Sequence, residues 1–451
     1  MRVGLIVLVI VVTTRAHAGG LVVVGGTPRA ISHAGASAVG DDGAGALLVN
    51  PAATARRDGT RIQLGVSLIE DATWWQSVAP GAPQSRDQAG TSVAPTAAVV
   101  GSVGSWIIGG GVMTSAVSER AYRDPVPTNQ NTEALFDYRY SGIAGSLRRD
   151  AVVVGVSRRF GDSLALGASL GASRVAVGET RRIWAGFAGV ARAGDETRDV
   201  QLELAGDRWF VPSAVIGVLF APLDTPLELG ASVGWSAGAR IRGDVAASDT
   251  NGSTTVVTNN PNASLLVRQP VAVRAGARYA GEAFSVELGG DVWLASDAAS
   301  EATWQIRGIT AVDPSTVTAA VTAVPSRLST RTHGAIRAAV DVELIAGFLW
   351  ASGGYAYTVG ATSQGRLSTS LGDLGGHTIA LGLEGNAGGF SLALGWSRTF
   401  AIARRGGQLL RLDNPFGAGD AAVPAGRFDG AVDQLGILID IELGATESSD
   451  L

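Results

Sequence analysis

Residues 227–244 read LELGASVGWSAGARIRGD, and this stretch decides the fold. Apolar side chains occupy every second position from Leu227 to Ile241, and glycine, serine, glutamate or arginine fills the positions between them. A period of two places these two sets on opposite faces of a β-strand. The apolar face is longer than the ~5–6 residues of an ordinary globular strand. The pattern therefore predicts a strand with one face against lipid and the other against water.

The same alternation recurs along the whole chain. Its repeats match the ~9–11 residues that a tilted strand needs to cross a membrane. We predict fourteen such strands, at 60–70, 91–101, 105–118, 150–160, 163–178, 208–221, 227–243, 270–280, 283–297, 333–345, 348–360, 376–386, 389–402 and 429–444.

The links between these strands alternate between tiny turns and long loops. Gly161-Asp162, Gly281-Glu282 and Ala387-Gly388 are short links, whereas the intervening links are far longer. An even strand number with short turns at one end and long loops at the other is the layout of an outer-membrane β-barrel. Closure of the barrel also removes the sheet edges that would otherwise aggregate. The alternative, a soluble β-sandwich, rarely needs so many long strands with such one-sided loops.

Composition supports export to a membrane and excludes several protein classes. Mean hydropathy is +0.23 without any run of ~18 apolar residues, so strands rather than helices must carry the apolar surface. The absence of cysteine excludes a disulfide scaffold, and a net charge of −5 without a basic run argues against nucleic-acid binding. Residues 1–18 resemble a signal peptide that ends in Ala16-His17-Ala18. A polar tail, 445–451, follows the last strand.

Catalytic and metal-binding motifs are weak. Gly-x-Ser-x-Gly occurs at 167–171 and 230–234, but both copies lie inside predicted strands rather than at the strand-to-helix turn of a nucleophile elbow. His33, His333 and His377 lack metal-ligand spacing. We therefore predict no catalytic residue, no metal, no cofactor and no enzyme activity.

The run GTPRAISHAGASAVGDDGAGALLVNPAATAR, 26–56, resembles the N-terminal segment of FadL-type outer-membrane transporters. In that family a Gly/Ala-rich stretch with an acidic pair leads into Asn-Pro-Ala and the first strand. Here these are Asp41-Asp42 and Asn50-Pro51-Ala52. The hairpins within 214–245 and 269–296 look similar to the family as well. The resemblance covers most of the chain, and the N-terminal motif is its most specific part.

The resemblance implies a fourteen-stranded barrel, 59–444, with residues 19–58 as a hatch inside the lumen. Its implied function is passive uptake of long-chain fatty acids or hydrocarbons across the outer membrane of a Gram-negative bacterium. Outer-membrane lipids and the barrel-assembly machinery are the other implied partners. The hatch residues would be Asp41, Asp42, Asn50, Pro51 and Ala52. The chain departs from the family in the polar tail after its last strand, and in Gly234-Trp235-Ser236, where the family has Tyr-Arg-Ser.

Candidate ligand contacts in the lumen are Arg240, Arg278 and Trp235, although charge pairs are expected in any polar barrel interior. Trp74 and Trp75 near the first long loop are candidates for capture of apolar ligands or for an interfacial aromatic belt. Three alternatives to a hydrophobic-compound channel stay open: a general polar porin, a structural barrel without transport, and a barrel enzyme acting on lipids.

Overall fold

The computed structural model describes residues 27–56, 59–123, 133–187, 193–222, 224–250, 253–297, 302–328, 330–406, 409–417 and 421–443. The predicted signal peptide, 1–18, and the predicted tail, 445–451, lie outside these residues. Among the described helices, none is both long and apolar enough to cross a membrane.

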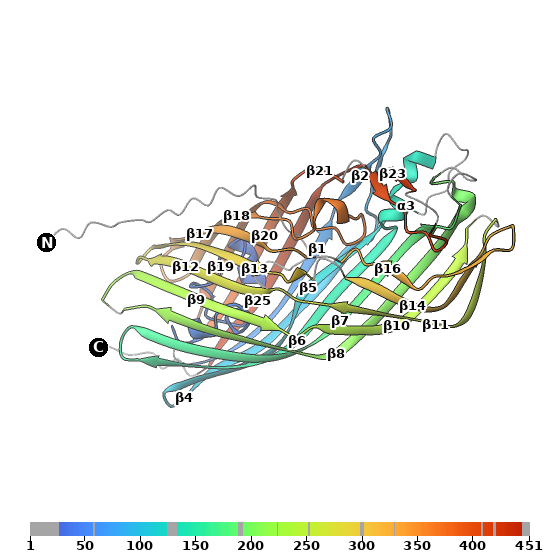
Figure 1. Ribbon diagram of the computed structural model, residues 1–451. Helices are drawn as coiled ribbons and strands as arrows, with labels where there is room; N and C mark the ends of the chain where they lie inside the picture. The colour runs from blue at the N-terminus through green and yellow to red at the C-terminus, as the bar shows by residue number, and fades with distance from the viewer. Residues whose placement is uncertain are drawn as a thin grey trace, which may run out of the picture.

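Fourteen antiparallel strands pair around a closed ring, as the alternation predicted. The first strand β1 pairs with the last strand β25, with Ile62 opposite Ile441, so the ring has no free edge at this level. Figure 1 shows these two strands within the wall. In ring order the strands are β1 (Thr60–Asp71), β4 (Thr91–Val103), β5 (Trp106–Ala121), β6 (Ala144–Phe160), β7 (Leu164–Trp184), β8 (Asp199–Phe220), β9 (Leu227–Ser236), β12 (Val271–Ala280), β13 (Phe284–Leu294), β17 (His333–Ile345), β18 (Leu349–Thr358), β19 (Gly376–Ala387), β20 (Phe390–Ala401) and β25 (Ala431–Leu443).

The two faces of the ring differ as the period of two requires. On β6, Val152 and Val154 are more than half exposed, whereas Ala151 and Val153 are buried. Exposed valine, leucine, isoleucine and aromatic side chains recur on the outer face of every barrel strand. Exposing such an apolar surface to water is unfavourable, whereas contact with lipid is not. The closed ring also pairs the backbone N–H and C=O groups, for which lipid offers no hydrogen-bond partners.

Shorter elements extend the wall and cover it at the long-loop end. The wall continues through β10 (Ala239–Asp249), β11 (Thr255–Val267), β14 (Thr303–Val312), β15 (Thr318–Ala320) and β16 (Ala323–Pro325). The loops form two small sheets, β2 (Trp74–Gln76) with β3 (Gln84–Arg86), β21 (Arg404–Arg405) and β24 (Arg427–Asp429), and β22 (Leu409–Arg411) with β23 (Ala422–Pro424). Short helices complete this end: η3 (Glu133–Phe136), α3 (Tyr138–Ser141), η4 (Glu196–Arg198) and η5 (Gln364–Arg366). Figure 1 shows β2, β21, β23 and α3 gathered there.

The strand predicted at 227–243 is broken, and its inward face changes at the break. Below the break Ser232 is buried, whereas above it Ala239 and Ile241 are buried and Arg240 is exposed. The kink at 237–238 shifts the alternation by one position, which moves every following side chain to the other face. The prediction that Arg240 faces the lumen is therefore wrong. Arg242 is displaced to the outer face for the same reason.

The N-terminal segment, residues 27–56, lies inside the ring. It contains α1 (Pro28–Ser32), α2 (Ala46–Val49) and η2 (Pro51–Arg56). Its hydrogen bonds reach strands on all sides of the barrel, including β6, β9, β17 and β19. Glycines make room for it: a Cβ on Gly167 of β7 would lie 2.4 Å from the Ala52 nitrogen.

Candidate functional site

Asn50 joins the N-terminal segment to the wall. Its side chain is fully buried, and Nδ2 donates to the carbonyl of Ala38 at 2.8 Å and to that of Val218 at 3.2 Å. Its Oδ1 accepts a hydrogen bond from the backbone nitrogen of Ala52 at 3.3 Å. Pro51 starts η2, where a proline costs no helical hydrogen bond. The Asn-Pro-Ala motif thus satisfies backbone groups of both the segment and β8, deep inside the barrel.

Ion pairs hold the rest of the segment. Asp42 accepts from Arg61 of β1 at 2.9 Å, and Arg29 donates to Glu384 of β19 at 2.6 Å. Both oxygens of Glu228 accept from Arg56 at 2.7 Å. Asp41 instead accepts from the backbone nitrogen of Gly43 at 3.0 Å. Several buried pairs on different strands fix this irregular segment more firmly than exposed pairs would.

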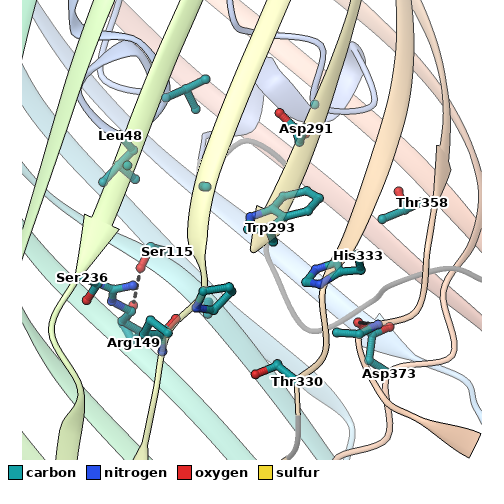
Figure 2. Close-up of a pocket in the computed structure, with 18 of the residues that line it drawn as sticks. Leu48, Ser115, Arg149, Ser236, Asp291, Trp293, Thr330, His333, Thr358 and Asp373 are labelled. Atoms are coloured by element: carbon teal, nitrogen blue, oxygen red, sulfur yellow. Dashed lines mark hydrogen bonds between the residues drawn. The ribbon is translucent and has the colours of Figure 1, made fainter. Parts of the chain in front are cut away.

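A cavity of about 300 Å³ lies between the N-terminal segment and the loop end of the barrel. Its floor includes Leu48 and Val49 of the segment. Apolar side chains of the surrounding strands and links complete much of the lining: Leu147, Val215, Trp235, Val267, Trp293 and Leu328. Figure 2 shows Leu48, Trp293, His333 and Arg149 around this space. The Trp293 and His333 rings stack there, with centroids 4.8 Å apart. Polar and charged side chains share the lining, among them Arg149, Arg268, Arg274, Asp291, Arg337 and Asp373. The cavity therefore suits a small molecule that is largely apolar but carries a polar group.

Arg149, a charged side chain in the cavity lining, has neutral hydrogen-bond partners. Its Nε donates to Ser173 Oγ at 3.1 Å and its Nη2 to Ser236 Oγ at 3.0 Å. Among the described residues we find no carboxylate paired with it, whereas Arg337 in the same lining donates to Asp291 at 2.6 Å. Arg149 therefore gives one end of the cavity an unneutralised positive charge.

The cavity extends to a break in the wall. The ladder between β9 and β12 ends at Gly234 and Ala272, and the ladder between β10 and β11 begins at Ala239 and Val267. The residues between, all of them described, form no rung of either ladder. Trp235 lies at this break, is 51% exposed, and lines the cavity together with the 268–270 link.

The other predicted site residues lie elsewhere. Arg278 pairs with Glu228 at 3.1 Å and lines a second, charged cavity of about 560 Å³ on the short-turn side of the segment. Trp75 is only 1% exposed because it packs against Tyr138 and Phe428 inside the loops. The prediction that Trp75 captures ligands, or forms part of an interfacial belt, is therefore wrong. Trp74 is half-buried beside Arg427, whose guanidinium lies 5.4 Å from its ring.

Sequence reasoning did not bring Arg149, Trp293 and His333 together as the lining of one cavity. Arg149 follows Arg148, and only the register of β6 decides which of the two points inward. Trp293 and His333 are forty positions apart and become neighbours because β13 pairs with β17 at that position. The only signal in the sequence was that the predicted strands place these side chains at inward-facing positions of neighbouring strands. Among the described residues, no group of three or more His, Cys, Asp or Glu side chains is arranged to hold a metal ion.

Comparisons with known proteins identify the fold. No protein-family model and no curated protein matches the sequence. Among solved structures, a Pseudomonas aeruginosa FadL homologue matches with a TM-score of 0.71 at 14% identity, over 95% of this chain and 100% of that chain. The Pseudomonas putida toluene transporter TodX matches with a TM-score of 0.64 at 14% identity, over 92% and 98%. The Ralstonia pickettii toluene transporter TbuX matches with a TM-score of 0.62 at 13% identity, over 92% and 98%.

These matches confirm the predicted fourteen-stranded barrel fold of FadL type. At 12–14% identity the likeness concerns the fold. What the cavity binds must be argued from its own residues.

Proposed function

We propose that this chain is an outer-membrane channel through which hydrophobic small molecules diffuse inward, with residues 27–56 as its hatch. The observation that carries the proposal is the cavity with its cluster of leucine, valine and tryptophan side chains, which the segment closes from the short-turn side and which extends to the wall at Trp235. Entry of an apolar molecule would be favourable by roughly 25 cal/mol for each Å² it buries. Release needs no chemical step, only a path out of the cavity.

Two ligand classes fit this proposal, hydrocarbons and fatty acids. Two proteins of the same fold are toluene transporters, and this likeness supports small aromatic hydrocarbons as the ligand class. Arg149 favours a ligand with a carboxylate, because its charge has only Ser173 and Ser236 as partners. Replacing Arg149 by Leu separates the classes. Uptake of a fatty acid would fall sharply while uptake of toluene would persist or rise, and the exposed loop substitution Arg86→Leu would change neither.

The direct test is uptake by cells that lack their own channel of this fold. Cells producing the chain should accumulate radiolabelled toluene or oleate faster than cells producing an empty vector. Unchanged uptake of both compounds, with normal barrel assembly, would favour the structural-barrel alternative. A large steady conductance in planar bilayers would favour a polar porin and contradict the closed hatch.

The exit path can be decided by locking the segment to the wall. Thr54 Oγ1 lies 2.7 Å from Ser157 Oγ, and the chain has no cysteine, so a Thr54→Cys/Ser157→Cys pair would give a single disulfide. If the hatch must move, oxidation stops uptake and a reductant restores it, whereas each single cysteine variant stays active. If uptake continues in the oxidised form, the ligand leaves through the wall beside Trp235.

A further inference from the structure

Arg181, near the loop end of β7, is buried without hydrogen-bond partners. Its side chain is 0% exposed, and Nε, Nη1 and Nη2 make no hydrogen bond within the described part of the chain. Its counter-charge is Asp413, whose Oδ2 lies 3.3 Å from Nη2. Leaving buried cationic donors unpaired costs stability unless another group satisfies them.

Arg327, in the link between β16 and β17, shares that same carboxylate oxygen. Its Nη2 lies 3.6 Å from Asp413 Oδ2 and donates to the carbonyl of Tyr140 at 2.9 Å, while its Nε has no partner among the described residues. The side chain is 4% exposed. Two buried guanidinium groups therefore depend on one oxygen of one carboxylate.

Neighbouring carboxylates do not make up the deficit. Glu179 accepts from Trp304 Nε1 at 3.0 Å, from the backbone nitrogen of Arg327 at 3.1 Å and from the Ser326 hydroxyl, which are all neutral donors. Asp199 is paired with Arg139 at 2.7 Å. Burial and the nearby Arg181 charge lower the pKa of Arg327 to about 10, although Asp413 and Glu179 act in the opposite direction.

We propose that Arg181 and Arg327 form a binding site for a small oxyanion, either a carboxylate or a phosphate. Guanidinium groups present planar donor forks that match the oxygens of both anions. An anion here would accept hydrogen bonds from the Nε and Nη donors that have no partner among the described residues. It would also add negative charge beside two guanidinium groups that now share Asp413. Asp413 is 22% exposed at its side chain, so the carboxylate that the two arginines share is reached by solvent from the loops. The site is separate from the cavity that Leu48 and Trp293 line, although Leu328, next to Arg327, lines that cavity.

The test uses the full chain purified in mild detergent, titrated with inorganic phosphate or with butyrate at constant ionic strength. The readout is the thermal unfolding midpoint followed by tryptophan fluorescence. We expect a saturable rise with at least one anion in the wild type and in the exposed control Arg86→Gln, and no such rise in Arg327→Gln. Tighter binding of phosphate identifies a site for free or head-group phosphate, and tighter binding of butyrate identifies a site for organic acids.

Asp413→Asn gives the sharper result, because it removes the competing carboxylate. A structural role for the cluster predicts a less stable protein with no anion response. The proposed site predicts an apparent anion affinity about tenfold tighter than that of the wild type, as expected for one lost charge competitor. If Arg327→Gln does not fold, this comparison decides. A response that does not saturate, that is equal in Arg327→Gln, or that weakens in Asp413→Asn would overturn the proposal.

Discussion

His33 Nε2 lies 2.6 Å from Asp341 Oδ1, and this contact joins the N-terminal segment to strand β17. Asp341 is held in turn by the hydroxyls of Ser285 and Ser352, at 2.8 and 2.7 Å. Burial lowers the pKa of His33, but the hydrogen bond and the negative charge of Asp341 outweigh burial, so its pKa lies above 6.5. The segment is therefore attached by a bond whose strength depends on a proton.

Alkaline pH should weaken this attachment. Because His33 binds its proton more tightly in the folded state, its contribution is complete below pH 6.5, the ordinary value, and is lost as pH rises through the raised pKa. The unfolding midpoint of His33→Gln should fall furthest below that of the wild type at pH 5.5, and much less at pH 9. Asp341→Asn should show the same trend, and the double variant should add little to it. A difference that does not change with pH would contradict the prediction.

Asn50→Ala should destabilise the segment without unfolding the barrel. The substitution leaves the carbonyls of Ala38 and Val218 without this donor and the Ala52 nitrogen without this acceptor, at a cost of about 1–3 kcal/mol. Hydrogen exchange of residues 27–56 should accelerate while exchange of the barrel strands stays unchanged. The exposed Asn259→Ala is the control. Equal acceleration of exchange in both variants would show that the Asn50 side chain does not stabilise the segment.

A methyl group on Gly167 should push the segment off the wall. A Cβ at this position would lie 2.4 Å from both the Ala52 nitrogen and the Pro51 carbonyl carbon, and neither backbone atom can yield easily. Overpacking of this kind costs about 1–3 kcal/mol. Gly385→Ala on β19 is the matched control, because a Cβ there approaches only the Phe348 carbonyl, at 4.0 Å. We expect Gly167→Ala alone to lower the unfolding midpoint and to increase entry of small antibiotics.

The sequence predicted all fourteen strands of the ring because lipid enforces strict alternation where it touches the wall. The prediction from sequence failed for side chains at the long-loop end of the barrel. Phe210, at φ +58°, and the kink at 237–238 shift the alternation of neighbouring strands, and the protein-filled interior of the loop end no longer requires one register. Arg240 was misplaced for this reason. Trp75 was misplaced because its burial depends on Phe428, which follows it by more than three hundred residues and pairs with it through β24.

The cavity's chemistry was harder to predict than the wall. Arg149 is an ordinary arginine in the sequence, and its importance comes from the absence of a paired carboxylate among the described residues. Whether a carboxylate pairs with a given arginine depends on all of the neighbouring strands and links. Asp41, Asp42 and Asn50 were easier to single out, because the run that contains them resembles the N-terminal segment of FadL-type transporters.

Removal of the segment should open the barrel. Deleting residues 26–52 keeps β1 and every strand pairing, but removes the floor formed by Leu48 and Val49 and joins the two cavities on either side of it. Because the lumen that remains is polar and wide enough for water, single-channel conductance should rise well above that of the wild type, and so should susceptibility to small antibiotics. Heat-modifiable migration of the variant on gels confirms that the barrel assembled, and Arg56→Gln, which weakens one attachment at Glu228, should give an intermediate conductance. If an assembled deletion variant conducts no more than the wild type, then other parts of the chain block the lumen and the segment is not its hatch.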